Sequence, residues 1–525
     1  MRKYTFIIVF VLCIIRSLFG APDNNPVSAG MTQSRNSGGN ALDAAYGNPA
    51  LLGTYRLPSS AISLIPTSVA FWSDKLAISP VNPYLPYALF GGRRDLSMWI
   101  TSVIDESFGI WNLNPDEVSE KLTKELRGGV SVYAGMRTSP FVYATTGFAF
   151  NMRSMTDIEI KAPEGMLLPV FSGTNGILSG ETHNFSDFSI EGIWATEVAV
   201  KLGFSTTVPV FRNLLNLDKA AAGVGFKYIL GHSYFEMKAD SECENILFYD
   251  PETNMYVVDA RFKVRNAGNT VSNNWQFNNP FAGRLINGQG LGLDLGSVFY
   301  NSSHSFSFDV QNIGFIFWGK NVSKSNFSFK KEGFDIVDIM EKEVDEIFDR
   351  TKGESFPNND DTLERVKSFL TYLPMAANIG YTYYYDLSSK GNIRDAVQYL
   401  SAGVNYEQQI VKGPGRSGYT PRFTFGAAAG FFDGAVPVRA GIILGGSEKI
   451  ASALGIGFDF TKFSLDGSYK AVGSPYFSPR RGMELAGAVT FMWGRKPNVF
   501  NAVYDEEEED FNVPKLESKE ESEGR

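Results

Sequence analysis

Hydrophobic and polar residues alternate with a period of two along much of the chain. In residues 290–299 one face carries Leu291, Leu293, Leu295 and Phe299, and the other carries Gly290, Gly292, Asp294 and Gly296. The same alternation runs through residues 194–204, 305–311, 436–445 and 454–460. Successive side chains of a β-strand point to opposite faces, so each segment predicts a strand with one apolar and one polar face.

The polar faces hold mostly Gly, Ser and Asn with scattered charges. Small residues there favour a closed barrel whose inner face is crowded by a plug or by the opposite wall. Aromatic residues near predicted strand ends suit the girdles of a membrane barrel: Tyr381, Tyr383, Tyr385, Tyr469 and Trp493. We predict an all-β fold, an antiparallel transmembrane β-barrel of about 14 strands over residues 60–494. A secreted, soluble β-protein is the alternative.

Two stretches have helical rather than strand periodicity. In residues 334–348, Ile336, Val337, Met340 and Val344 fall on one helical face. A second helix is expected around Thr362–Leu373, ended by Pro374, and another at 114–127, ended by Gly128-Gly129. We expect helical loop insertions at about 114–127 and 333–373 that cover the barrel mouth or pack in the lumen. A solvated insertion with no gating role is the alternative.

The sequence patterns at the two ends of the chain differ from the strand alternation of its middle. Arg2 and Lys3 precede the apolar stretch Thr5–Ile15, which predicts a signal peptide over residues 1–21. That stretch is shorter than the roughly 20 residues of a membrane-spanning helix. Residues 495–525 are polar and acidic, with a run of acidic residues from Asp505 to Asp510, and we expect a disordered tail. Export and the strand pattern together predict a location in the bacterial outer membrane.

The amino-acid composition limits the kinds of function that the chain can have. The chain has 42 Phe, 23 Tyr and 52 Gly, but its mean hydropathy is only -0.12, which suits strands with a single apolar face. A net charge of -9 argues against a nucleic-acid partner. Only Cys13, Cys243 and three histidines are available, without ligand-like spacing or a Ser/His/acid constellation. We therefore expect no metal, no cofactor and no enzyme activity.

Charged residues on the predicted polar faces are the candidate lumen-facing groups. They are Glu197, Lys201, Lys227, Asp294, Asp309, Arg439 and Asp459. Opposite charges across a narrow lumen would pair and rigidify the barrel. The alternative is that they act as a selectivity filter.

The segment from Ser37 to Leu52 carries the most specific motif. It joins small residues, the acidic Asp43 and the sequence Asn48-Pro49-Ala50 just before the first predicted strand. This pattern resembles the N-terminal hatch of the FadL-like outer-membrane superfamily, which includes long-chain fatty-acid transporters and PorV-like shuttle proteins of type IX secretion. Further similarity, in residues 290–296, 310–314, 373–380 and 438–441, is to a subset of unknown function. The resemblance implies a hatch over residues 22–59, with Asn48, Pro49 and Ala50 at its centre.

Two functions follow as expectations. The first is passive passage of small hydrophobic compounds through a lumen that the hatch blocks at rest. The second is a structural or secretion-associated anchor in outer-membrane lipid that binds other proteins through its loops and tail. The aromatic end of the last strand, Met483–Trp493, resembles the signal read by the barrel-assembly machinery, which would be a partner during biogenesis.

Overall fold

The computed structural model describes most of the chain, with gaps at its ends and in its connections. The described residues are 25–34, 37–39, 41–54, 60–74, 128–165, 182–207, 217, 219–242, 244–250, 255–268, 285–334, 364–387, 397–412, 420–432, 434–460, 462–476 and 481–493. The predicted signal peptide, the helix at 114–127, Cys243 and the tail at 495–525 lie outside them. Within the described part, no helix is long and apolar enough to cross a membrane.

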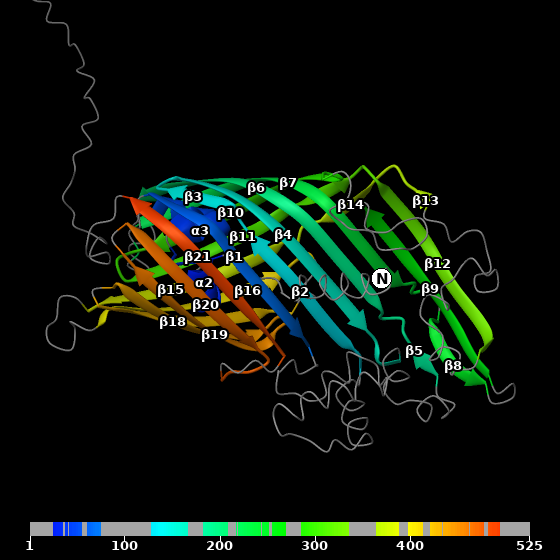
Figure 1. Cartoon of the computed structure of the whole chain (residues 1–525). Helices are drawn as coiled ribbons and strands as arrows, with labels where there is room; N and C mark the ends of the chain where they lie inside the picture. Colours follow the sequence, from blue (N-terminus) through cyan, green and yellow to red (C-terminus); the bar gives the residue numbers. More distant parts are fainter. Residues whose placement is uncertain are drawn as a thin grey trace, which may run out of the picture.

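A single antiparallel sheet closes on itself to form the barrel (Figure 1). Its first and last strands pair, with Ser60 opposite Trp493 and Phe71 opposite Met483. In order around the wall, the strands are β1 (Ser60–Ser73), β2 (Val130–Thr138) with β3 (Phe141–Thr145), β4 (Phe148–Ala162), β6 (Ser189–Thr207), β7 (Lys219–Ala239), β10 (Gly288–Tyr300), β11 (His304–Trp318), β14 (Phe369–Tyr372) with β15 (Ala376–Asp386), β16 (Val397–Gln409), β17 (Arg422–Phe431), β18 (Val436–Gly445), β19 (Lys449–Asp459), β20 (Phe463–Val472) and β21 (Gly482–Trp493).

Two of these wall strands are interrupted at a proline, which cannot donate to the ladder. β2 and β3 are separated at Ser139-Pro140, beside Pro66 of β1, where the pairing of β1 with β21 also shifts. β14 and β15 are separated around Pro374, opposite a bulge of β11 at Asn312. Each interrupted strand fills one place in the wall, so the barrel has 14 strands, as predicted.

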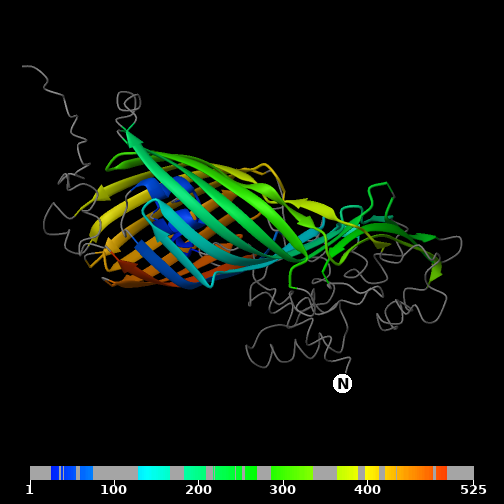
Figure 2. The same cartoon turned by 90° about the horizontal axis from the view of Figure 1, so that it is seen from above.

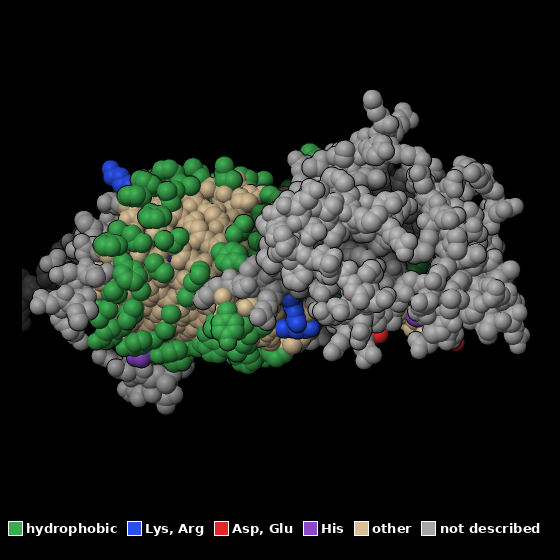
Figure 3. Space-filling view, turned by 60° about the horizontal axis from the view of Figure 1, so that its bottom comes forward, with side chains coloured by type: hydrophobic (Ala, Val, Ile, Leu, Met, Phe, Trp, Pro, Cys, Tyr) green, Lys and Arg blue, Asp and Glu red, His purple; other side chains and the backbone are tan. Residues whose placement is uncertain are grey.

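The outer surface of the wall is apolar. Leu291, Leu295, Phe308 and Ile456 are 60%, 44%, 50% and 47% exposed, whereas Asp294 on the opposite face is fully buried. Figure 3 shows hydrophobic side chains spread over the visible barrel surface, with few charges among them. A wall with its apolar side chains outward and its charges inward is suited to lipid, because lipid leaves a charge unsolvated. The faces predicted from the alternation are therefore confirmed.

The two ends of the barrel differ. At the end that holds Ser60 and Trp493, the chain turns tightly, at residues 146–147 and 301–303; we call it the turn end. At the opposite end, the loop end, the sheet leaves the barrel. There β7 stops pairing with β10 at Gly231 and pairs with β9 from Tyr234 to Ala239.

This continuation of the sheet, which we call the canopy, projects to the right of the barrel in Figure 1 and in the view from above in Figure 2. Besides the end of β7, it consists of β5 (His183–Asn184), β8 (Ile246–Asp250), β9 (Met255–Ala267), β12 (Val322–Phe334) and β13 (Glu364–Arg365). Strand β12 pairs with β9 along nearly its whole length and with β13 at Ser323 and Lys324.

The helix predicted over Thr362–Leu373 is wrong for Glu364–Arg365 and Phe369–Tyr372, which form the strands β13 and β14. Phe369–Tyr372 pairs with β11, and the Phe369 ring lies 5.6 Å from Tyr234 and 6.3 Å from Trp318. Pairing with a strand distant in sequence outweighs a weak local helical pattern. The first predicted helix begins at Phe334, which instead ends β12, and residues 335–363 lie outside the described residues.

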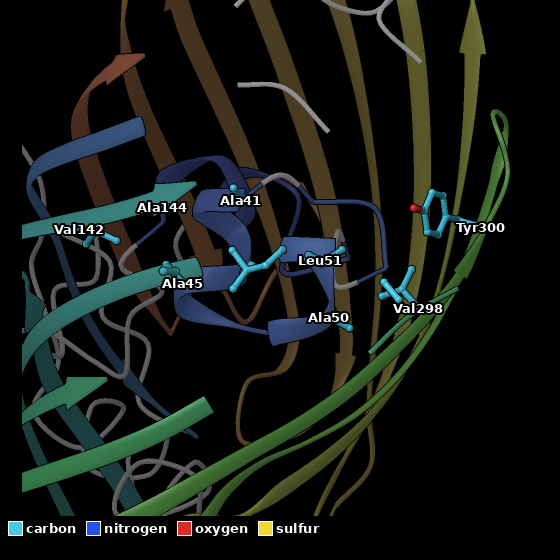
Figure 4. Close-up of a cluster of buried hydrophobic side chains, with 12 residues drawn as sticks. Ala41, Ala45, Ala50, Leu51, Val142, Ala144, Val298 and Tyr300 are labelled. Atoms are coloured by element: carbon cyan, nitrogen blue, oxygen red, sulfur yellow. The ribbon is translucent and has the colours of Figure 1, made fainter. Parts of the chain in front are cut away.

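The N-terminal segment lies inside the barrel, as the hatch motif predicted (Figure 2). It folds into α2 (Pro26–Gly30), α3 (Ala41–Tyr46) and the 3-10 helix η1 (Pro49–Thr54). The Asn25 side chain caps α2 by accepting from the Val27 amide at 3.0 Å, and proline occupies the first turn. Alanines and leucines of α3 and η1 pack against Val142, Val298 and Tyr300 of the wall (Figure 4).

A charge placed on the lipid-facing surface tests the orientation of the wall. We expect Ile456→Arg to reduce the free energy of unfolding in vesicles by about 2–4 kcal/mol, the cost of a cation near the bilayer midplane. Tyr476→Arg is the control, because Tyr476 is 79% exposed in the connection between β20 and β21 at the loop end. Equal losses for both variants would contradict the orientation.

Candidate functional site

One half of the hatch rests on a row of three glycines. Gly203, Gly223 and Gly296 are direct partners across β6, β7 and β10. A side chain at Gly203 would stand 2.6 Å from Leu52 Cβ, and one at Gly223 would collide with the backbone of Pro49 and Ala50. The absence of side chains lets the hatch backbone lie directly on the wall.

The other half of the hatch rests on a second row. Gly403, Gly426 and Gly441 are direct partners across β16, β17 and β18. A Cβ at Gly426 would lie 2.5 Å from the Met31 carbonyl oxygen, and one at Gly441 would lie 2.7 Å from Thr32 Oγ1. The expectation that small residues on the polar faces accommodate a plug is confirmed at these six positions.

The central hatch residues Asn48, Pro49 and Ala50 all lie at the first glycine row. The fully buried side chain of Asn48 accepts from the Ala50 amide at 2.9 Å and donates to the Ser297 carbonyl at 3.5 Å. A side chain at Gly296 would collide with Asn48 Oδ1. Asn48 therefore both shapes the turn into η1 and touches the wall.

Four of the seven predicted lumen-facing residues meet in one buried chain of alternating charges. Asp294 lies between Lys201 at 3.0 Å and Lys227 at 2.8 Å, and Glu197 lies between Lys227 at 3.7 Å and Arg153 at 3.0 Å. We call this set the ion chain. Each carboxylate thus has two cations, which compensates its loss of water.

The ion chain contacts both the hatch and the wall bulge. Lys201 Nζ donates to the Gly47 carbonyl of the hatch at 2.6 Å. Asp294 also accepts from the backbone amide of Asn312, the bulged residue of β11, at 2.8 Å, and Lys227 donates to the side chain of Asn312 at 2.6 Å. Hatch, ion chain and bulge are therefore connected.

The other three predicted residues lie elsewhere. Asp309 is buried and accepts from Gln311 at 2.7 Å and Asn378 at 3.0 Å. Arg439 is buried and pairs with Asp466 at 2.8 Å. Asp459 is half-buried at the end of β19, toward the turn end.

A second buried ionic network was missed from the sequence. Arg422 pairs with Glu407 at 3.2 Å and Glu448 at 3.4 Å, and Lys470 pairs with Glu448 at 3.5 Å and with Glu484. Arg422 also donates to the side chain of Gln33 in the hatch. A residue-by-residue extension of the alternation in β16, β17, β20 and β21 would have placed Glu407, Arg422, Lys470 and Glu484 on the inner face, whereas Glu448 lies in the turn before β19.

A cavity of about 490 Å³ occupies the lumen between the hatch and the canopy. Its ionisable lining contains equal numbers of cations and anions: Arg137, Arg153, Lys227, Lys238, Arg265 and Lys412 against Asp43, Asp157, Glu191, Glu197, Glu236 and Glu407. Apolar side chains share the wall, among them Met155, Ile193, Leu370, Leu373, Pro374 and Val411. The cavity can therefore contact both an apolar body and a polar group.

Ion pairs also order the canopy side of the cavity. Glu236 pairs with Arg265 and Lys238. Burial acts to raise the pKa of Glu236, but the hydrogen bonds from Arg265 and Lys238 outweigh it and the pKa is lowered. This carboxylate therefore stays ionised at neutral pH. Among the described residues, no group of three or more His, Cys, Asp or Glu side chains is placed to hold a metal ion.

The chain matches a known protein family. Residues 100–499 match the model of a family described as a family of unknown function, DUF5723. The chain belongs to this family. No curated protein matches the chain.

Solved structures similar to this DUF5723 member include a FadL homologue and a toluene transporter. A Pseudomonas aeruginosa FadL homologue matches with a TM-score of 0.42 and 12% identity, over 90% of this chain and 99% of that one. The P. putida toluene transporter TodX matches with a TM-score of 0.34 and 10% identity, over 87% and 95%. The barrel fold itself rests on the strand pairing of this chain.

Two glycine substitutions test how the hatch is seated. Gly223→Ala places a Cβ against the backbone of Pro49 and Ala50, and we expect it to reduce the free energy of unfolding by about 1–3 kcal/mol. Gly467→Ala is the matched control, because a Cβ at Gly467 of β20 meets no atom within 4 Å. If denaturant unfolding gives the two variants the same free energy of unfolding, the close packing of the hatch backbone against Gly223 is wrong.

Proposed function

We propose that the protein is a passive channel of the bacterial outer membrane, closed at rest by its hatch, that passes small and largely hydrophobic compounds. The observation that carries the proposal is the cavity of about 490 Å³ inside the barrel, bounded by the hatch. Its size is within the range of pockets for small molecules, roughly 300–1,000 Å³. Short turns of outer-membrane barrels face the periplasm, so the cavity would fill from outside and the hatch would close the periplasmic side.

The residues that line the cavity indicate what kind of solute it can hold. Apolar residues such as Met155, Ile193 and Leu373 suit a hydrophobic body. The charged residues of the same lining would lose hydration against a purely apolar solute, which costs free energy. A hydrophobic compound with at least one polar or charged group fits both parts of the wall. The glycine-rich inner face, by contrast, is occupied by the hatch and contributes little open surface.

Uptake into proteoliposomes tests passage and gating together. The full mature chain and a variant lacking residues 22–54 would be compared with an aromatic carboxylate and a sugar of similar size. We expect selective uptake of the aromatic solute, which rises when the hatch is deleted because the periplasmic side is then open. Absence of uptake in both proteins, with barrels shown to be folded by heat-modifiable gel mobility, would refute the channel.

A second candidate function, a structural or secretion-associated anchor, is favoured by the canopy. Spanning a membrane needs about 9–11 residues per strand, yet β7 has 21 residues and continues beyond the barrel into the canopy. Such a surface outside the barrel is suited to binding another protein.

Deleting segments that contribute no described strand tests the anchor. Deletion should be limited to residues 335–363 or 496–525, because Glu364–Arg365 and Phe369–Tyr372 are strand residues that pair with β12 and β11. If the protein is an anchor, one of these deletions is expected to abolish co-purification of a specific partner while the barrel still folds. Unchanged co-purification in both deletion variants would count against an anchor that binds its partner through either of these segments.

A further inference from the structure

Each half of the hatch accepts one hydrogen bond from a buried cation of the wall. Lys201 of β6 donates to the Gly47 carbonyl, which follows α3. Arg422 of β17 donates to the side chain of Gln33, which follows α2. The two cations come from strands on different sides of the lumen and contact different hatch elements. They therefore act on the two halves independently.

Both cations are held in place by wall carboxylates rather than by the hatch. Lys201 is 1% exposed and pairs with Asp294, which is itself fully buried and fixed by Lys227 and the Asn312 amide. Arg422 is 8% exposed and pairs with Glu407 and Glu448. If the hatch moves away, each cation keeps its carboxylate partner. The bond to the hatch can break without leaving a buried charge unpaired, whose cost would otherwise oppose opening.

The other contacts of the hatch are of a different kind. At the glycine rows the backbone lies against the wall in non-directional van der Waals contact. Neutral hydrogen bonds, such as that from the Gly147 amide to the Leu52 carbonyl at 3.0 Å, add to this contact. Hydrogen bonds from a charged donor are about twice as strong as neutral ones. The hydrogen bonds that Lys201 and Arg422 donate to the hatch thus have charged donors, which makes each of them stronger than a neutral bond of this kind.

We propose that Lys201 and Arg422 are two latches that hold the hatch in the lumen, one for each half. Lys201 positions η1 and the end of α3 over the first glycine row, and Arg422 positions the segment after α2 over the second. The proposal rests on the proposed gating by the hatch, because it names the residues that regulate this gate. Asp294, Glu407 and Glu448 act through the latches by fixing the direction of each cation.

Thiol labelling of the hatch tests the latches without any solute. In a background with Cys243→Ser, reporters would be placed at Ala45→Cys, near Gly47, and at Ser34→Cys, near Gln33; these native residues are 1% and 0% exposed. We expect Lys201→Met to raise the maleimide reaction rate at position 45 by about tenfold or more and Arg422→Met to do so at position 34. Each variant should leave the other reporter nearly unchanged. Lys201→Arg and Arg422→Lys, which keep the charge, should restore most of the protection.

A buried lysine of the wall provides the matched control. Lys470 is 6% exposed, is held by Glu448 and Glu484, and makes no hydrogen bond to the hatch within the described part of the chain. Lys470→Met should leave the reporter at position 45 protected, because Lys470 shares its partner Glu448 with Arg422 and not with Lys201. Equal labelling in Lys201→Met and Lys470→Met would show that loss of any buried cation loosens the barrel, which would overturn the proposal. Protection unchanged in Lys201→Met and Arg422→Met would overturn it as well.

Two further measurements keep the outcomes distinct. A methionine variant that fails to fold would be recognised by its heat-modifiable gel mobility. In that case Gln33→Leu removes the hatch-side acceptor of Arg422 and leaves the wall intact. The proposal then requires that the labelling rate at position 34 rises in Gln33→Leu. Uptake assays on the same proteins separate the latches from the channel. Increased labelling without uptake supports the latches and refutes passage, whereas uptake with unaltered labelling refutes the latches alone.

Discussion

The whole arrangement depends on how closely the hatch backbone can approach the barrel wall. Gly203, Gly223 and Gly296 stand side by side on three neighbouring strands, and a methyl group on any of them would meet the hatch. A chain segment can fill the lumen of a 14-strand barrel only where the wall has no side chains to fill it first. The glycine rows therefore decide where the plug lies, and the remaining inner positions are free to carry charge.

Those charges form ordered networks rather than a diffuse polar lining. In the ion chain each carboxylate is shared between two cations, and the terminal Lys201 is satisfied by a carbonyl of the hatch. A buried carboxylate with two cations and good geometry is tolerated, whereas a lone one would be costly. The same groups that stabilise the wall thus also contact the segment that closes it.

The cavity lies where the barrel is least regular. The bulge at Asn312 and the break around Pro374 face one another across β11 and the β14–β15 strand, and both residues line the cavity. Toward the loop end the wall continues as the canopy, which adds Glu236, Lys238 and Arg265 to the lining of the cavity. A regular barrel would present only alternating side chains at this level. The bulge, the break and the canopy together form a cavity in the lumen that is lined by charged residues.

The sequence by itself determined the barrel, its inner and outer faces and the hatch, because a period of two and a motif of small residues are local patterns. Leu291 and Asp294 could be assigned to opposite faces from their spacing alone. The choice of partners was decided by the tertiary structure. Lys201 meets Asp294, and Gly203 aligns with Gly223, only through the registers of β6, β7 and β10, which no local pattern contains. Residues 369–372, helical in their local pattern, became a strand because their backbone pairs with β11 and Phe369 packs on Tyr234. Local periodicity fixes the direction of a side chain, whereas closure of the sheet fixes its neighbours.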